Sequence, residues 1–176
     1  MSRTLLPSGA RVVPGFISAG GAEDLLAAVD ASDWRADLKR RVQHYGWRYD
    51  YRERRVRENM RLGPLPDWLA PVTDAVGRLS EFERRPDQVI VNEYLPGQGI
   101  FAHVDCEPCF GPAVASLSLC GPADMIFRPR PSGERLSIML EPLMLMILSG
   151  EARYEWTHEI PARRSDIVDG QRQPRH

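Results

Sequence analysis

The 176-residue sequence lacks several features that would assign it to a specialised class of protein. It contains no apolar run approaching the roughly 18 residues that a membrane span requires. Residues 1–6 also lack the charged-then-apolar pattern of a secretory signal. Only three cysteines are present, an odd and small number that argues against a disulfide scaffold and favours a reducing compartment. These absences predict a cytoplasmic protein that has no membrane partner.

The sequence also lacks an excess of charge of either sign. Its 23 basic and 24 acidic residues give a net charge of −1, which excludes a globally basic nucleic-acid-binding protein but permits a local basic patch. Hydrophobic residues make up 43% and charged residues 27%, so the chain can form a packed core and does not have the composition of a disordered protein. The length predicts one domain over residues 1–176.

The first half of the sequence predicts two helices. Proline and glycine recur in residues 1–17, which is typical of an extended lead-in, and Ser18 is a suitable N-cap for a short helix. A second helix is expected to begin near Pro66, because apolar residues follow it at helical spacing: Leu69, Val72, Val76 and Leu79. The segment 39–62 has no clear period and is compatible with a hairpin or a loop.

From residue 87 the pattern changes to short β-like runs separated by glycine and proline turns. The expected strands are 88–95, 100–104, 114–119, 124–127, 136–140, 143–148 and 152–156. This pattern predicts a mainly β protein with flanking helices, in which the strands form a jelly roll. We therefore expect a helical and lid part over residues 1–86 and a jelly-roll core over residues 87–176.

The tripeptide His103-Val104-Asp105 is a candidate for metal binding. In a strand, residues i and i+2 point to the same face, so an imidazole and a carboxylate converge there. His158 follows an expected strand and is the natural third ligand. Together the three residues would form a 2-His-1-carboxylate facial triad, which leaves positions open on an Fe(II) ion.

Other motifs accompany this set in a fixed order. Asn92-Glu93-Tyr94-x-x-Gly97 precedes the tripeptide, and Gly150-Glu151-x-Arg153-Tyr154-x-Trp156-x-His158 follows it. Their order and spacing resemble those of the AlkB family of 2-oxoglutarate- and Fe(II)-dependent dioxygenases, from about Pro14 to Pro161. The run His44 to Tyr51 is most similar to the branch that includes tRNA-modifying members.

The resemblance implies a fold, cofactors and an activity. The fold would be a double-stranded β-helix, with His103, Asp105 and His158 binding iron, and with Asn92 and Tyr94 contacting the co-substrate 2-oxoglutarate. With O2, the protein would hydroxylate or oxidatively dealkylate an alkylated or modified nucleic-acid base. The alternatives are an oxygenase acting on a protein or a small molecule, and a non-catalytic or zinc-binding interaction module.

The sequence departs from the family pattern near residue 176. AlkB-like sequences carry a strand with the pattern Arg-x-x-Ser-x-Thr-Phe-Arg, whose arginines hold the distal carboxylate of 2-oxoglutarate. Four arginines near this end do not match the pattern: Arg163, Arg164, Arg172 and Arg175. We therefore expect residues 1–176 to bind 2-oxoglutarate weakly and to leave one sheet edge without a strand.

Residues with aromatic and charged side chains are candidates for substrate binding. Between His44 and Arg61, six arginines against three acidic residues give a local charge of +3, and Trp47, Tyr49 and Tyr51 interleave with them. Aromatic faces stack on bases while arginines meet phosphates, so this segment is expected to bind a single-stranded or flipped nucleotide. The alternative is a solvated hairpin. Glu107 could accept a hydrogen bond from a base, and Arg153 could orient a ligand or pair with Glu151 or Glu155.

Cys106-Glu107-Pro108-Cys109 directly follows the candidate metal ligands. With His103 or Cys120 the two thiols could form a zinc site, and a redox function is a further alternative. The order of a zinc-deaminase signature is absent, as is a second cysteine pair. We expect two cysteines in a loop beside the metal.

Overall fold

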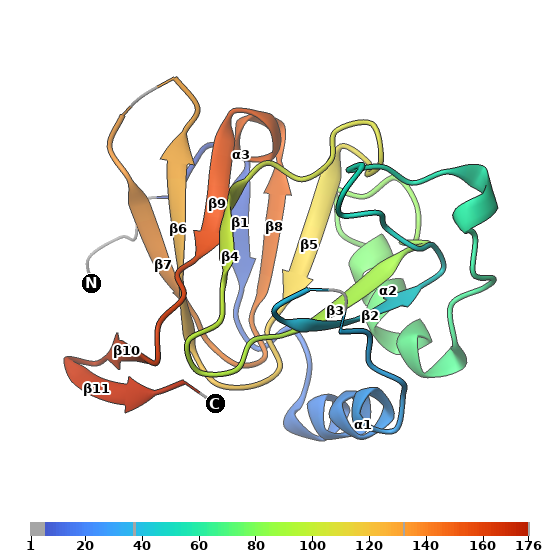
Figure 1. Cartoon of the computed structure of the whole chain (residues 1–176), viewed down its shortest axis with the longest axis horizontal. Coiled ribbons are helices and arrows are strands. Elements are labelled where there is room, and N and C mark those ends of the chain that lie inside the picture. The colour runs from blue at the N-terminus through green and yellow to red at the C-terminus, as the bar shows by residue number, and fades with distance from the viewer. Residues whose placement is uncertain (1–5, 37, 132, 176) are drawn as a thin grey trace.

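A computed structural model describes residues 6–36, 38–131 and 133–175 of the chain. Figure 1 shows two facing layers of strands, with helices and irregular segments beside one end of them. The elements are, in chain order: β1 (Ala10–Val13), α1 (Ala19–Asp30), β2 (Arg41–Tyr45), η1 (Glu58–Met60), η2 (Asp67–Leu69), α2 (Ala70–Gly77), β3 (Val89–Glu93), β4 (Ile100–His103), β5 (Ala113–Leu117), β6 (Ala123–Pro129), β7 (Leu136–Leu140), β8 (Leu145–Ser149), α3 (Gly150–Tyr154), β9 (Trp156–Ile160), β10 (Ser165–Val168) and β11 (Gln171–Pro174).

The two layers are antiparallel sheets with the strand orders β1-β8-β5 and β4-β9-β6-β7. Side chains from both sheets form one buried cluster, which includes Met125 and Phe127 of β6 and Met146 and Leu148 of β8. Alternating strand faces supply this core, as expected for two packed sheets. The predicted jelly roll is confirmed.

The two predicted helices are present. Ser18 caps α1, because its Oγ accepts a hydrogen bond from the Gly21 backbone N–H at 3.1 Å. The second helix begins as η2 and continues as α2, with a proline in its first turn. Val76 of α2 packs against Leu145 and Ile147 of β8, so this helix covers one sheet. Among the described residues, no helix is sufficiently long and apolar to traverse a bilayer.

The predicted strand over residues 152–156 is wrong. Residues 150–154 form the short helix α3, and the strand β9 begins only at Trp156. The reason is visible in the burial: Ala152 and Arg153 are each only 1% exposed, and one helical turn can bury two adjacent side chains against a core. In a strand with one open face, the two would point to opposite sides.

Strands are not confined to residues 87–176. β1 pairs with β8 and β2 pairs with β3, so the first part of the chain contributes a strand to each of two sheets. The hairpin of β10 and β11 was not predicted from the sequence either. In the described residues, β3 and β5 each pair on one edge only, and each of these two strands therefore has an edge without a strand partner.

Candidate metal centre

His103, Asp105 and His158 converge on one point between two neighbouring strands. β4 and β9 are antiparallel partners, and His103 lies directly opposite His158 in their register. The ligand atoms of the three residues all lie within 4.8 Å of one another. The Asp105 carboxylate is 3.6 Å from His103 Nε2 and 3.7 Å from His158 Nε2. These separations exceed a normal N–H···O hydrogen bond and suit ligands bound to one ion at about 2.1 Å each.

The ring of His103 is oriented by its own strand. Its Nδ1 lies 2.7 Å from the Phe101 carbonyl oxygen. A carbonyl can only accept a hydrogen bond, so Nδ1 carries the proton and Nε2 presents its lone pair toward Asp105 and His158. Support of this kind is what fixes the tautomer of a metal-binding histidine.

Burial and charge set the protonation of the other two groups. Burial lowers the pKa of His158 to about 4, so its imidazole is neutral at pH 7 and can donate a lone pair to a metal. Burial acts to raise the pKa of Asp105, but the attraction of His103, His158 and Arg153 outweighs burial and leaves the pKa below its usual value. Two imidazoles and one carboxylate are the donor set of a facial triad for Fe(II).

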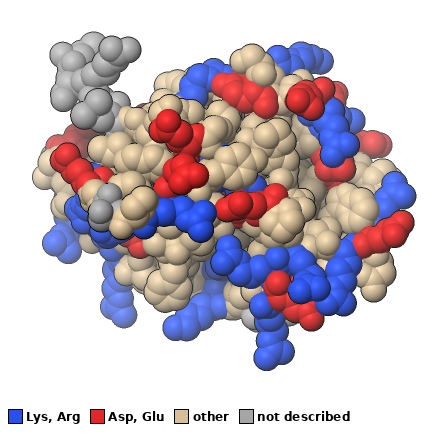
Figure 2. All heavy atoms as spheres, turned by 90° about the horizontal axis from the view of Figure 1, so that it is seen from above, with Lys and Arg blue, Asp and Glu red and all other residues tan. Residues whose placement is uncertain are grey.

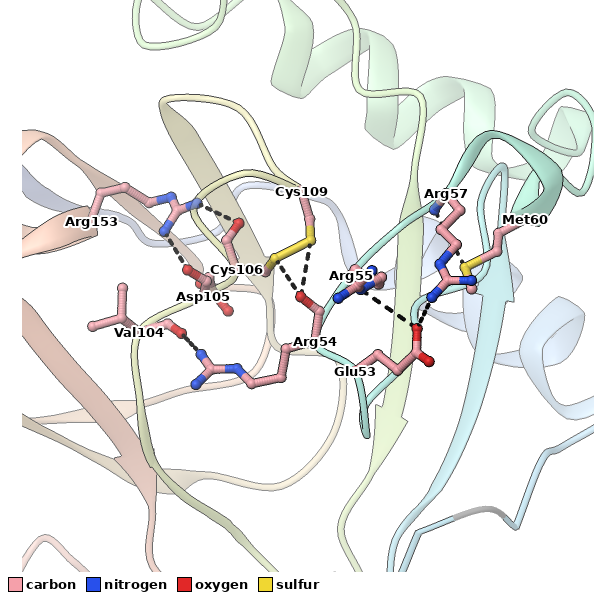
Figure 3. Close-up of a disulfide and its surroundings, with 10 residues drawn as sticks. All are labelled: Glu53, Arg54, Arg55, Arg57, Met60, Val104, Asp105, Cys106, Cys109 and Arg153. Atoms are coloured by element: carbon pink, nitrogen blue, oxygen red, sulfur yellow. Dashed lines mark hydrogen bonds and ion pairs between the residues drawn. A yellow bond between two sulfur atoms is a disulfide. The ribbon is translucent and has the colours of Figure 1, made fainter.

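Asp105 does not lie in a strand, contrary to the prediction from its spacing to His103. β4 ends at His103, and Asp105 lies in the loop that follows, residues 104–111. The buried Arg153 fixes this loop by donating hydrogen bonds to the carbonyl oxygens of Asp105 at 2.9 Å, Cys106 at 3.3 Å and Gly111 at 3.4 Å. Surface pairing of Arg153 with Glu151 or Glu155 is therefore excluded. Figure 3 shows its guanidinium directed at the backbone of Asp105 and Cys106.

Asn92 and Tyr94 meet at an arginine that the sequence reasoning missed. Arg40 Nε donates to Asn92 Oδ1 at 2.8 Å, and the Arg40 guanidinium lies 5.7 Å from the centre of the Tyr94 ring. Burial raises the pKa of the Tyr94 hydroxyl; the positive charge of Arg40 opposes this shift and the negative charge of Asp105 adds to it. Arg40 directly precedes β2, and β2 pairs with β3, which carries Asn92. The sequence alone does not show this strand pairing, so it could not show that Arg40 lies beside Asn92.

Part of the segment 44–61 lies against the loop 104–111. The ring of Tyr49 contacts those of Tyr51 and Phe110, with centroids 4.9 and 5.4 Å apart. Tyr51 also meets the Arg40 guanidinium, so these tyrosines extend from the loop to the residues near Asn92. Trp47 is placed differently: it lines a hollow together with Arg61 and Arg85. The structure therefore brings Tyr49 and Tyr51 together and sets Trp47 apart from them.

Several charged side chains of this segment have protein partners. Glu53 forms ion pairs with Arg57 and, at 3.5 Å, with Arg55. Glu107, the other candidate substrate ligand, is exposed and lies 3.3 Å from Arg130. Figure 2 shows basic and acidic side chains intermixed across the face that it presents. The local excess of arginine is thus partly neutralised in the fold.

Cys106 and Cys109 are joined by a disulfide bond. The sequence reasoning placed the pair correctly in a loop beside the metal ligands, but as two separate cysteines. Bonded sulfurs cannot act as thiolate ligands, so this form of the protein has no zinc site at the pair. The third cysteine, Cys120, is free and exposed.

Comparison with known proteins gives the family. The model of the 2OG-Fe(II) oxygenase superfamily matches residues 9–175. The chain belongs to this superfamily. Its relatives within the superfamily include AlkB homologues: the bovine "Alpha-ketoglutarate-dependent dioxygenase alkB homolog 7, mitochondrial" is 30% identical, over 97% of this chain and 75% of its own length. The resemblance seen in the sequence is thereby confirmed.

Two further relatives share more sequence. The "Alkylated DNA repair protein ALKBH8 homolog" of Arabidopsis thaliana is 36% identical over 91% of this chain and 53% of its own length. The "tRNA (carboxymethyluridine(34)-5-O)-methyltransferase ALKBH8" of Macaca fascicularis is 37% identical over 93% and 26%. The chain thus spans about half or less of these two relatives. The structure of OsALKBH1 superposes with a TM-score of 0.69 at 15% identity, covering 93% of this chain and 88% of that one, which shows the shared fold.

Proposed function

We propose that this chain is the catalytic domain of a dioxygenase that uses Fe(II) and 2-oxoglutarate. The observation that carries the proposal is the convergence of His103, Asp105 and His158, whose ligand atoms lie within 4.8 Å of one another on a jelly-roll scaffold. The donor set fits Fe(II), and these three residues would hold it. When bound, the iron supplies the means to activate O2 for hydroxylation of a substrate C–H bond.

The residues around the triad have separate tasks in this proposal. Asn92 and Tyr94 offer hydrogen bonds to 2-oxoglutarate, and the Arg40 guanidinium beside them offers a positive charge to one of its carboxylates. Arg153 holds the loop that carries Asp105. The half-buried rings of Tyr49 and Tyr51 cover the neighbouring surface and limit the access of water.

We assign the substrate to the class of alkylated or modified nucleic-acid bases. The relatives support this, since by name they include an alkylated-DNA repair protein and a tRNA methyltransferase. The tyrosines and arginines of the segment 44–61 support it as well, because aromatic rings stack on bases and arginines contact phosphates. A hydroxylated N-methyl group would leave as formaldehyde.

The ion pairs of Glu53 favour a second candidate, a protein or small-molecule substrate, because they reduce the positive charge available for phosphates. One experiment separates the two. The chain is supplied with Fe(II), 2-oxoglutarate and O2, and succinate and formaldehyde are measured with a methylated oligonucleotide, with the same oligonucleotide unmethylated, and without either.

The proposal predicts formaldehyde only with the methylated oligonucleotide, in amounts matching the succinate formed in excess of the blank. Equal amounts of succinate with and without the oligonucleotide would still support a dioxygenase activity, but would favour a protein or small-molecule substrate. No succinate under any condition, in a sample with one bound iron per chain, would contradict the catalytic proposal. His158→Ala is the negative control.

A further inference from the structure

The disulfide Cys106–Cys109 lies where two parts of the protein meet. It is within the loop 104–111, one residue after the metal ligand Asp105, and it faces the turn 50–55 of the segment 44–61. The carbonyl oxygen of Arg54 lies 3.1 Å from Cys106 Sγ and 3.6 Å from Cys109 Sγ. Both sulfurs therefore contact one atom of the turn.

Arg54 makes a second contact with the same loop. Its guanidinium donates to the Val104 carbonyl oxygen at 2.9 Å. The turn that carries it is held by Asp50, whose side chain accepts hydrogen bonds from the backbone N–H groups of Arg52 and Glu53. Arg54 itself has a φ of 51°, in the left-handed region that favours glycine. In this conformation the Arg54 carbonyl faces the two sulfurs, while its guanidinium binds the Val104 carbonyl.

The loop is thus fixed from two sides. Arg153 holds it from the core through the carbonyls of Asp105, Cys106 and Gly111, and Arg54 holds it from the turn. Figure 3 shows the contacts of Arg153 with Asp105 and Cys106 and of Arg54 with Val104. The disulfide closes the loop between these two anchors. Whether the disulfide is oxidised or reduced should therefore affect both the position of the turn 50–55 and the mobility of the loop next to Asp105.

Breaking the bond would displace atoms in a confined place. Two thiol sulfurs cannot remain at bonding distance and must separate to van der Waals contact. Cys106 is only 5% exposed, so its sulfur has no open space to enter. The Arg54 carbonyl contacts both sulfurs, so their separation disturbs the contact between the disulfide and the turn.

We propose that Cys106 and Cys109 form a thiol–disulfide exchange site whose oxidised state docks the turn 50–55 on the loop that carries Asp105 and whose reduced state releases it. The co-reactant is a small dithiol or a dithiol protein. One of its thiolates attacks the sulfur of Cys109, the less buried of the pair; the Cys106–Cys109 bond breaks and Cys106 leaves as a thiolate that takes up a proton. The second thiol of the reagent then attacks the mixed disulfide, leaving Cys109 as a thiol and the reagent as its own disulfide. Two electrons and two protons pass to the pair, and excess disulfide reagent reverses the reaction.

The cysteine count is consistent with a local, reversible bond. The sequence has one further cysteine only, and disulfides in proteins of reducing compartments are in most cases transient and redox-responsive. The inference requires neither iron nor turnover, so it can fail or succeed independently of the proposed dioxygenase activity.

The test uses the metal-free full chain in two redox states. The chain is equilibrated with excess oxidised or reduced dithiothreitol, the thiols are counted by alkylation and mass measurement, and amide hydrogen exchange is followed by mass spectrometry. We expect one alkylatable thiol in the oxidised state and three in the reduced state. Reduction should accelerate exchange in residues 50–55 and 104–111 on the order of tenfold, with exchange in β8 unchanged.

Matched variants identify the cause. The double variant Cys106→Ser/Cys109→Ser should exchange at the fast rate in both buffers, and Cys120→Ser should behave as the wild type. Three alkylatable thiols in the presence of excess disulfide would overturn the proposal, as would equal exchange of both segments in the two states of the wild type. The wild-type comparison stands even where the double variant folds poorly.

Discussion

The metal triad and the segment 44–61 lie close together but are held in different ways. The triad rests on paired strands, on a backbone carbonyl that orients His103 and on a fully buried arginine. After Tyr45 the segment 44–61 contains only the short helix η1 and isolated bridges, and its other contacts are exposed ion pairs, ring contacts and one turn. The proposed iron site is therefore held by paired strands, whereas the proposed substrate-binding segment is held by contacts that are individually weak.

The largest effect is expected when a candidate metal-binding residue is removed. His158→Ala should abolish succinate formation, with a loss of about a thousandfold or more, because two remaining ligands cannot hold the iron in the geometry of a facial triad. His44→Ala removes a histidine of the 44–61 segment, whose Nε2 lies 3.1 Å from the Tyr51 hydroxyl, and should retain most of the activity. Equal losses in the two variants would show that the metal site and the segment cannot be separated.

A smaller effect is expected from the support of the Asp105 loop. Arg153→Met leaves three backbone carbonyls without their donor, and it should lower the free energy of unfolding by about 3 kcal/mol. The variant should also weaken iron binding, since Asp105 loses its fixed position. Arg130→Met, on the exposed side of the same region, is the matched control and should change stability by less than about 0.5 kcal/mol. Denaturant unfolding without metal measures both, and equal stability of the two variants would contradict the role given to Arg153.

Affinity for 2-oxoglutarate tests the residue that the sequence reasoning missed. Arg40→Ala should weaken binding to the iron-loaded chain by about ten- to a hundredfold, the loss that removal of a charge-assisted hydrogen bond typically causes. The neighbouring Arg41 pairs with Glu93 and stacks on Trp34, so Arg41→Ala should leave the affinity unchanged. Calorimetric titration under anaerobic conditions compares the two. An unchanged affinity of Arg40→Ala for 2-oxoglutarate would contradict the proposed role of Arg40 beside Asn92 and Tyr94.

The smallest effect concerns single arginines of the segment 44–61. Arg48 and Arg52 carry charges that could meet phosphates, and both are replaced with alanine. The slope of log affinity against log salt should then fall by about 0.7 for each phosphate of a single-stranded oligonucleotide that the variant no longer neutralises. Tyr49→Phe keeps the ring and should preserve the slope. Fluorescence anisotropy at several salt concentrations measures this. Binding of the wild type that does not depend on salt would favour the protein or small-molecule substrate.

Residue spacing and family motifs singled out His103, Asp105 and His158, which the structure brings together, although Asp105 lies in a loop and not in a strand. Short apolar runs between glycine and proline turns predicted most strands of the jelly roll. The cap of α1 was equally readable, because Ser18 acts within a single turn of its helix. These features depend on local sequence.

What the sequence could not predict depends on contacts between distant segments. The helix α3 was mistaken for a strand because a five-residue element shows too little periodicity, and only packing decides between the two. Arg40 meets Asn92 through the pairing of β2 with β3, two strands that are separated in the chain by the whole segment from Gly46 to Gln88. The placement of Arg153 under the Asp105 loop and the contact of Arg54 with the disulfide are of the same kind. The cytoplasmic location stays a prediction.

Anaerobic titration with Fe(II) shows whether His103, Asp105 and His158 hold one iron. We expect saturation at one ion per chain in the wild type and in His44→Ala. It predicts that the site is lost in His158→Ala while the circular dichroism spectrum of the variant remains that of the wild type. No binding by the wild type, or unchanged binding by a folded His158→Ala, would contradict the account.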